Sequence, residues 1–97
     1  WIVTADEVGD PSDQHIFTRR NGDVVQDDDT DLMIFDTKYL IAHTSKFTQL
    51  EPGDMIATGS PSGSIIGTKE KNWLKPGDVV EVEIPAIGVL SNPVVAE

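Results

Sequence analysis

The residues most able to do chemistry lie in one glycine- and serine-rich stretch, residues 58–67, which reads TGSPSGSIIG. A phosphate-binding P-loop ends in Gly-Lys-Ser or Gly-Lys-Thr, and a nucleophile elbow needs a serine with glycines two positions before and after it. Neither pattern fits any register of the stretch, and Pro61 argues against a flexible linker. Two interpretations stay open: a ligand-binding loop at a strand end, in which the hydroxyls of Thr58 and Ser60 face the ligand, or a turn without function.

A run of acidic residues, QDDDTD at 26–31, has the composition of a calcium-binding loop. An EF-hand starting at Asp27 would need glycine at its sixth position and glutamate at its twelfth. This chain has Leu32 and Lys38 there, so an EF-hand is excluded. The interpretation that remains is a solvated turn.

The two histidines, His15 and His43, stand alone, without the HxxxH or HExxH spacing of a metal site. Neither is assigned to catalysis. The residue types and spacings therefore give no acid–base pair, nucleophile or complete metal site, and they support an acidic, β-rich domain with one candidate loop.

The elements that position these residues are predicted to be mostly strands. IFTRRNGDVVQD predicts a β-hairpin, because Asn21-Gly22 accepts the positive φ angles of a type I′ turn between strands at 15–20 and 23–27. DTKYLIAHTSKF predicts the one helix, with Asp36 as its N-cap, and this helix should end before Glu51-Pro52.

A Pro-Gly-Asp motif occurs twice, at 52–54 and 76–78, and each copy predicts a type II turn that starts a strand. The second copy leads into VVEVEI at 79–84, where valine and isoleucine alternate with glutamate as in a half-buried strand. IGVLSNPVV at 87–95 is its expected partner. The predicted fold class is α+β, mostly β with one helix, without a linker or a second domain.

The charge of the chain excludes several partners. It carries 17 acidic and 7 basic residues, for a net charge of −10. Such a surface repels phosphate backbones and anionic bilayers, so we expect no nucleic acid and no membrane as a partner. No apolar run approaches the ~18 residues that a membrane helix needs. The chain has no cysteine, so disulfides and thiolate metal sites are excluded, and the cytoplasm is the default location.

A series of short motifs follows along the chain: Trp1-Ile2-Val3-Thr4, Asn21-Gly22, Gln26-Asp27 through Thr30 to Met33-Ile34-Phe35, Leu50-Glu51-Pro52-Gly53-Asp54, Thr58-Gly59-Ser60-Pro61-Ser62-Gly63, Leu74-Lys75-Pro76-Gly77-Asp78-Val79-Val80 and Asn92-Pro93-Val94-Val95. Each is weak alone, but in this order and spacing they resemble the C-terminal portion of the fumarylacetoacetate hydrolase family. Two departures stand out. The family's Asp-Gly-Asn-Thr is Asp-Asp-Asp-Thr at 27–30, and its Thr-Gly-Thr-Pro-x-Gly-Val-Gly is TGSPSGSI at 58–65.

The resemblance implies a metal-dependent enzyme of aromatic or amino-acid catabolism that hydrolyses, decarboxylates, isomerises or hydrates small 2-oxo acids, commonly as a homodimer. It implies a metal ion, Mg²⁺ or Mn²⁺, held by carboxylates. This ion would stabilise an enolate or oxyanion on the substrate. The family's metal ligands and acid–base residues precede the segment that matches Trp1, so the catalytic residues stay unknown and no metal ligand is expected in this chain. Residues 1–97 would be the C-terminal part of one catalytic domain, with the family's mixed β-sandwich and β-roll fold, and would be inactive alone.

Only the glycine-rich loop inherits a role from the resemblance. Thr58 would hydrogen-bond the substrate, with Gly59 and Ser60 shaping the wall beside it. Thr30 and residues 33–35 would support the site by packing. A hydroxyl suits the task because it donates to a carboxylate without adding charge to an anionic site.

Two other hypotheses belong to different classes. One is a non-catalytic, β-rich binding or structural module whose Pro-Gly-Asp turns only punctuate a sheet. The other is a degenerate family member retained for its dimer interface. Paired Glu-x-Glu carboxylates and a later aspartate upstream of Trp1 would favour the enzyme.

Overall fold

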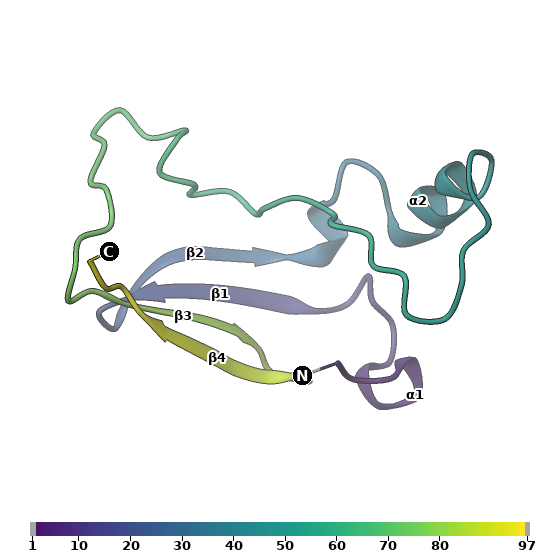
Figure 1. Ribbon diagram of the computed structural model, residues 1–97, viewed down its shortest axis with the longest axis horizontal. Coiled ribbons are helices and arrows are strands. Elements are labelled where there is room, and N and C mark those ends of the chain that lie inside the picture. Colours follow the sequence, from purple (N-terminus) through teal and green to yellow (C-terminus); the bar gives the residue numbers. More distant parts are fainter. Residues whose placement is uncertain (1, 97) are drawn as a thin grey trace.

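The computed structural model describes residues 2–96, and Trp1 and Glu97, the ends of the predicted 1–97 domain, lie outside the described residues. Residues 2–96 form a four-stranded antiparallel sheet with strand order β2-β1-β3-β4. The strands are β1 His15–Arg20, β2 Asp23–Asp29, β3 Val79–Ile84 and β4 Gly88–Pro93. Helix α1, Ala5–Val8, precedes the sheet, and helix α2, Thr37–Thr44, lies beyond the end of β2 (Figure 1). The predicted α+β class is confirmed, with the four-residue α1 added to the helix that the sequence predicts.

The first hairpin forms around Asn21-Gly22, as predicted. Asn21 has φ 54° and Gly22 has φ 89°, the positive angles of a type I′ turn. Strand β2 runs two residues beyond the predicted end at Asp27, because β1 continues to pair with it as far as His15 opposite Asp29. The register shifts between Thr18 and Arg19, which marks a β-bulge in the hairpin.

The second hairpin pairs β3 with β4, as predicted, and β3 also pairs with β1 to complete the sheet.

Asp78, from the second Pro-Gly-Asp turn, connects the two hairpins by hydrogen bonds. Its carboxylate accepts hydrogen bonds from Asn21 Nδ2 (2.8 Å), the Lys75 amide (2.8 Å) and Arg20 (2.6 Å). These donors, Asn21 foremost, lower the pKa of Asp78 to about 2.

The first Pro-Gly-Asp turn does not start a strand, and here the prediction is wrong. The turn itself forms: Gly53 has φ 103°, and the Asp54 amide donates to the Glu51 carbonyl at 3.0 Å. Residues 55–60, however, are neither helix nor strand. A strand exists only where a neighbouring strand offers backbone partners, and within residues 2–96 no strand pairs with this segment.

Helix α2 starts at the predicted cap. The Asp36 carboxylate accepts a hydrogen bond from the Tyr39 amide at 2.6 Å, which satisfies a free donor of the first turn. Phe35, Tyr39, His43 and Phe47 recur every four residues, and their rings form a column with successive centroid distances of 4.6, 5.9 and 5.2 Å. Tyr39 and His43 lie within α2 and share one side of it, and Phe35 and Phe47 extend the column beyond its two ends.

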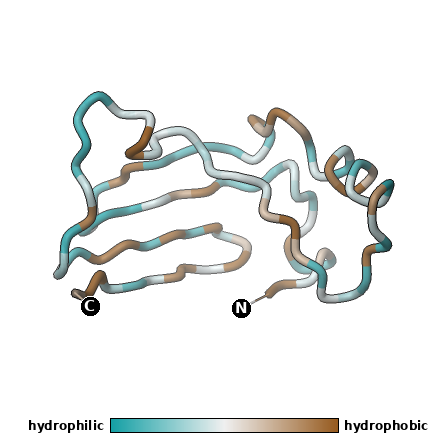
Figure 2. Tube along the Cα trace, turned by 45° about the horizontal axis from the view of Figure 1, so that its top comes forward, coloured by the Kyte–Doolittle hydropathy of each residue, from teal (hydrophilic) through white to brown (hydrophobic). Residues whose placement is uncertain are grey.

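Hydrophobic residues are spread over the strands, α2 and the connecting segments (Figure 2). None of them is buried within residues 2–96, and Ile34 and Met55 are 94% and 84% exposed. A chain of this length is expected to bury a modest core, so these residues lack the burial that stabilises a domain on its own. No helix among residues 2–96 is long and apolar enough to cross a membrane.

Candidate functional site

The glycine-rich loop borders a hollow of about 770 Å³ at the end of the sheet nearest α2. The rest of the lining comes from the end of β2 and the segment that leads to α2, and the lining residues are 58–62 of the loop with Ile16, 28–30, 32–35 and Leu40. The hollow therefore brings together Thr58, Gly59 and Ser60 with Thr30 and residues 33–35, which the family resemblance placed near one site.

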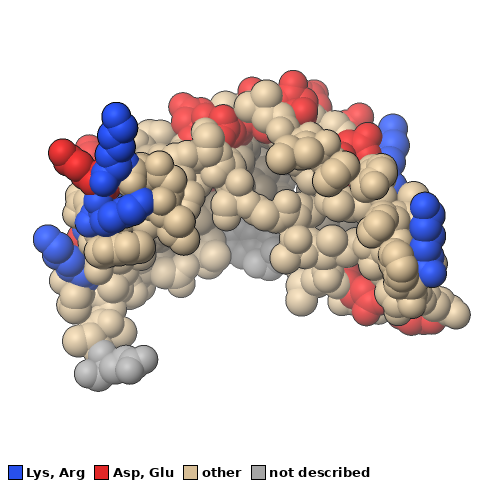
Figure 3. Space-filling view, turned by 90° about the horizontal axis from the view of Figure 1, so that it is seen from above, with Lys and Arg blue, Asp and Glu red and all other residues tan. Residues whose placement is uncertain are grey.

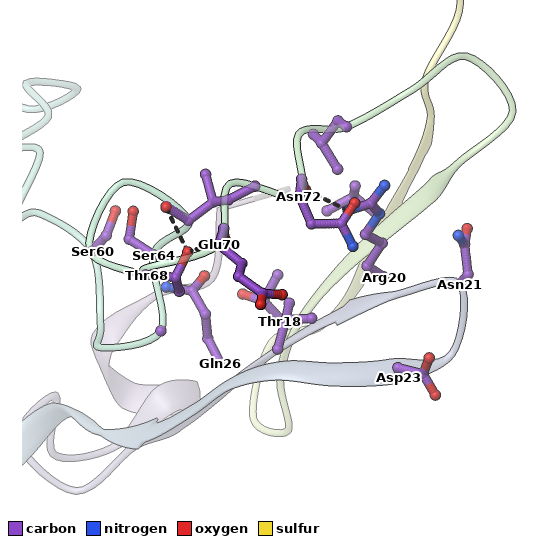
Figure 4. A pocket seen from close by; sticks show the side chains of 15 residues that line it. Thr18, Arg20, Asn21, Asp23, Gln26, Ser60, Ser64, Thr68, Glu70 and Asn72 are labelled. Carbon is purple, nitrogen blue, oxygen red and sulfur yellow. Dashed lines mark hydrogen bonds between the residues drawn. The ribbon is translucent and has the colours of Figure 1, made fainter.

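Thr58 and Ser60 each lie between two hollows. Thr58 also lines a smaller one of about 320 Å³, bordered by α2 and the first Pro-Gly-Asp turn. Ser60 also lines a third hollow of about 640 Å³, between residues 60–74 and the sheet. Figure 4 shows this third hollow, with Ser60 on the loop side and Thr18 and Gln26 on the strands. Gly59 has φ 100° and open space where a side chain would start, so the wall at this point is backbone.

Strand β2 holds the loop through two side chains. The Asp28 carboxylate oxygen Oδ2 accepts hydrogen bonds from the Ser62 amide (2.7 Å) and the Ser62 hydroxyl (2.6 Å). Gln26 Nε2 donates to the carbonyls of Pro61 and Ser62, each at 3.0 Å. The Ser62 hydrogen bonds hold the pKa of Asp28 below its usual value. Asp28, one of the departures from the family pattern, thus joins the acidic run to the glycine-rich loop.

The loop also passes close to the backbone of β2 at Gly63. An added Cβ there would lie less than 3.0 Å from the Val25 carbonyl oxygen and 3.3 Å from Gln26 Cγ. Gly63 has φ 82°, which a residue with a side chain rarely adopts. Only glycine fits where the loop crosses β2.

Residues 26–29 of the acidic run belong to strand β2, and residues 30–31 begin a short 3-10 helix, Thr30–Leu32, where the sequence suggested a solvated turn. His15 Nε2 bonds Asp27 Oδ1 at 2.6 Å, and His15 Nδ1 bonds Asp29 Oδ1. Carboxylates only accept hydrogen bonds, so protonated His15, with a donor on each ring nitrogen, satisfies both contacts. The hydrogen bond to Asp29, and then that to Asp27, raise the pKa of His15 above its usual value.

His15 is a residue that sequence reasoning missed. The signal was present, because alternate residues of a strand share a face and the hairpin brings β1 opposite β2.

Acidic side chains gather along the top of the face seen in Figure 3, and basic ones lie toward its two ends. Within residues 2–96 no group of three or more His, Asp or Glu side chains is arranged to hold a metal ion. The family resemblance places the metal ligands before Trp1, outside these residues.

Comparison with known proteins identifies the family. Residues 1–95 match the family described as fumarylacetoacetate (FAA) hydrolase C-terminal. The match spans almost the whole chain, so the protein belongs to the fumarylacetoacetate hydrolase family.

Curated relatives include the mitochondrial oxaloacetate tautomerase of Xenopus laevis, 48% identical over 94 residues, which are 97% of this chain and 30% of that protein. Among solved structures, the fumarylacetoacetate hydrolase of Exiguobacterium antarcticum is 42% identical with a TM-score of 0.91, over 98% of this chain and 34% of that one. A maleylpyruvate hydrolase of a Sphingobium species, solved with manganese(II) and pyruvate, is 34% identical with a TM-score of 0.85, over 98% and 33%. The chain thus spans about a third of the proteins it matches.

Proposed function

We propose that the protein is a divalent-metal-dependent enzyme that acts on small 2-oxo acids, by hydrolysis, decarboxylation, isomerisation or hydration, in aromatic or amino-acid catabolism. Membership of the family supports this proposal. Relatives named as oxaloacetate tautomerase, maleylpyruvate hydrolase and 5-carboxymethyl-2-hydroxymuconate delta-isomerase cover isomerisation and hydrolysis.

In this proposal residues 58–60 form one wall of the substrate site. The observation that carries it is the hollow of about 770 Å³ that Thr58, Gly59 and Ser60 share with Thr30 and residues 33–35. Thr58 is exposed, so its hydroxyl is free to donate to a carboxylate or 2-oxo oxygen of the substrate. Gly59 keeps the wall open, because it places no side chain between this hydroxyl and the ligand.

The proposal assigns the metal, Mg²⁺ or Mn²⁺, and the acid–base residues to the part of the protein that precedes Trp1. Manganese(II) in the structure of the Sphingobium maleylpyruvate hydrolase supports a divalent ion in a relative 34% identical to this chain. Residues 2–96 then contribute the substrate wall and the sheet that carries it, and residues 1–97 form the C-terminal part of one catalytic domain.

The test is a pair of variants at Thr58 in the full-length protein, assayed with oxaloacetate and acylpyruvates in the presence of Mg²⁺ or Mn²⁺. A hydrogen bond to a charged group contributes about 1.5–3 kcal/mol, so Thr58→Ala should lower kcat/KM by about 10- to 150-fold. Thr58→Ser keeps the hydroxyl and should retain most of the activity. Metal affinity, followed by Mn²⁺ titration, should stay unchanged. Unchanged steady-state kinetics in Thr58→Ala would refute the assignment of Thr58.

We further propose that the enzyme works as a homodimer in the cytoplasm, without nucleic-acid or membrane partners. Several vertebrate relatives are named as mitochondrial, so the compartment is a point to measure. Light scattering coupled to size-exclusion chromatography tests the dimer, and cell fractionation tests the location.

A further inference from the structure

The loop that carries Thr58 has little regular structure of its own. Residues 55–62 belong to no helix or strand. Gly59 and Gly63 both have positive φ angles, so the backbone at these points has conformations open to few other residues. The position of such a segment depends on the contacts it makes with its surroundings.

Strand β2 supplies contacts to three polar groups of one loop residue, Ser62. The Ser62 amide and hydroxyl donate to Asp28 Oδ2 at 2.7 and 2.6 Å, and the Ser62 carbonyl accepts from Gln26 Nε2 at 3.0 Å. The loop is thereby fixed to a strand of the sheet at a point four residues after Thr58. A strand is a rigid support for a loop, so these bonds set where residues 58–62 lie.

Asp28 lines the same hollow as Thr58, but its charge is unsuited to contact with an anionic substrate. A carboxylate next to a 2-oxo acid would repel it, because like charges at short range are destabilising. Its Oδ2 atom already accepts two hydrogen bonds from Ser62. Its neighbours Asp27 and Asp29 are bonded to His15, whose protonated form offsets the charge of the acidic run. Asp28 is thus placed to hold the loop and does not bind the ligand.

We propose that Asp28 is a positioning residue: by binding Ser62 it fixes the glycine-rich loop on β2 and so sets the position of Thr58 toward the substrate. This inference rests on the proposed function for the role of Thr58. The loop attachment itself rests on the contacts between Asp28 and Ser62.

The experiment compares Asp28→Ala, Ser62→Ala, Thr58→Ala and the double variant Asp28→Ala/Thr58→Ala in the full-length protein. Asp23→Ala, at the exposed start of the same strand, is the matched control. We expect Asp28→Ala to raise KM about tenfold and to change kcat less than threefold, because the support of the loop is lost while the chemistry is not. Ser62→Ala removes only the hydroxyl bond and leaves β2 intact, so it should give a smaller increase in KM. Asp28→Asn keeps an acceptor oxygen and should restore KM to near the wild-type value.

The double variant separates positioning from a general effect on folding. If Asp28 acts through Thr58, adding Asp28→Ala to Thr58→Ala should change KM less than twofold. An equal, tenfold effect in both backgrounds would overturn the proposal, as would a fall in kcat at constant KM in Asp28→Ala.

Amide hydrogen exchange over residues 58–63 provides a readout that does not depend on activity. Asp28→Ala should speed exchange there at least tenfold, and Asp23→Ala should not. Unchanged exchange would overturn the attachment of the loop by Asp28. Faster exchange in Asp28→Ala together with normal kinetics in Thr58→Ala would support the attachment and refute the proposed role of Thr58.

Discussion

Gly63→Ala in the full-length protein measures how firmly the loop is seated on β2. Two costs add at this position. The residue must adopt φ 82°, which costs a side chain about 1–2 kcal/mol. The new Cβ would also lie less than 3.0 Å from the Val25 carbonyl oxygen, a backbone atom that does not move without disturbing the strand. Overpacking of this kind costs about 1–3 kcal/mol.

We therefore expect Gly63→Ala to lower the free energy of unfolding by about 2–5 kcal/mol, measured by urea denaturation. Gly53→Ala is the control, because Gly53 also has a positive φ, 103°, but open space where a Cβ would be. It should show only the backbone cost of about 1–2 kcal/mol. If the two variants differ by less than about 0.5 kcal/mol, which is within the usual effect of a surface substitution, the loop moves away from β2 freely and the described seating is incorrect. A loop displaced by Gly63→Ala should also lower kcat/KM.

Two further predictions concern charge and burial. The pKa of His15 is raised in the folded protein, so its contribution to stability is full below its unfolded value near 6.5 and is lost as the pH rises through the folded value. The urea midpoint of the full-length wild-type protein should therefore fall between about pH 6 and about pH 9, and His15→Gln should abolish this fall. An identical pH profile in both proteins would contradict the pairing with Asp27 and Asp29. The 97-residue chain produced alone buries no hydrophobic side chain among residues 2–96, so it should melt without a cooperative transition, show no turnover and bind the dye ANS. A sharp calorimetric transition of the isolated chain would contradict this expectation.

Local turn and cap chemistry made several parts of the fold predictable. Asn21-Gly22 accepts positive φ angles that few other pairs tolerate, and Asp36 offers an acceptor where a helix needs one. Such signals depend on a few adjacent residues, so they can be interpreted without knowledge of the rest of the structure. The strand expected after Gly53 failed for the opposite reason, because a strand depends on a partner that the local sequence does not specify.

The contacts of the candidate site depend on a single irregularity in the first hairpin. Near the turn Arg20 faces Asp23, but beyond the bulge His15 faces Asp29. Without the bulge the register would place Asp28 opposite His15, and the acidic side chains would exchange faces. Asp28 would then point away from Ser62. The sequence predicts the hairpin but not the bulge, so it could not show which aspartates meet the histidine and which one meets the loop.

The order of the strands also has a consequence for how the protein folds. Each edge strand joins its neighbour through a short turn, while the central pair, β1 and β3, brings together Arg19 and Glu83, which are 64 residues apart. Short loops close within microseconds, and pairing between distant segments is slower because more chain entropy is lost first. The two hairpins should therefore form early and pair with each other late. The hydrogen bonds of Asp78 with Arg20 and Asn21 then connect them. The centre of the sheet would therefore be completed last.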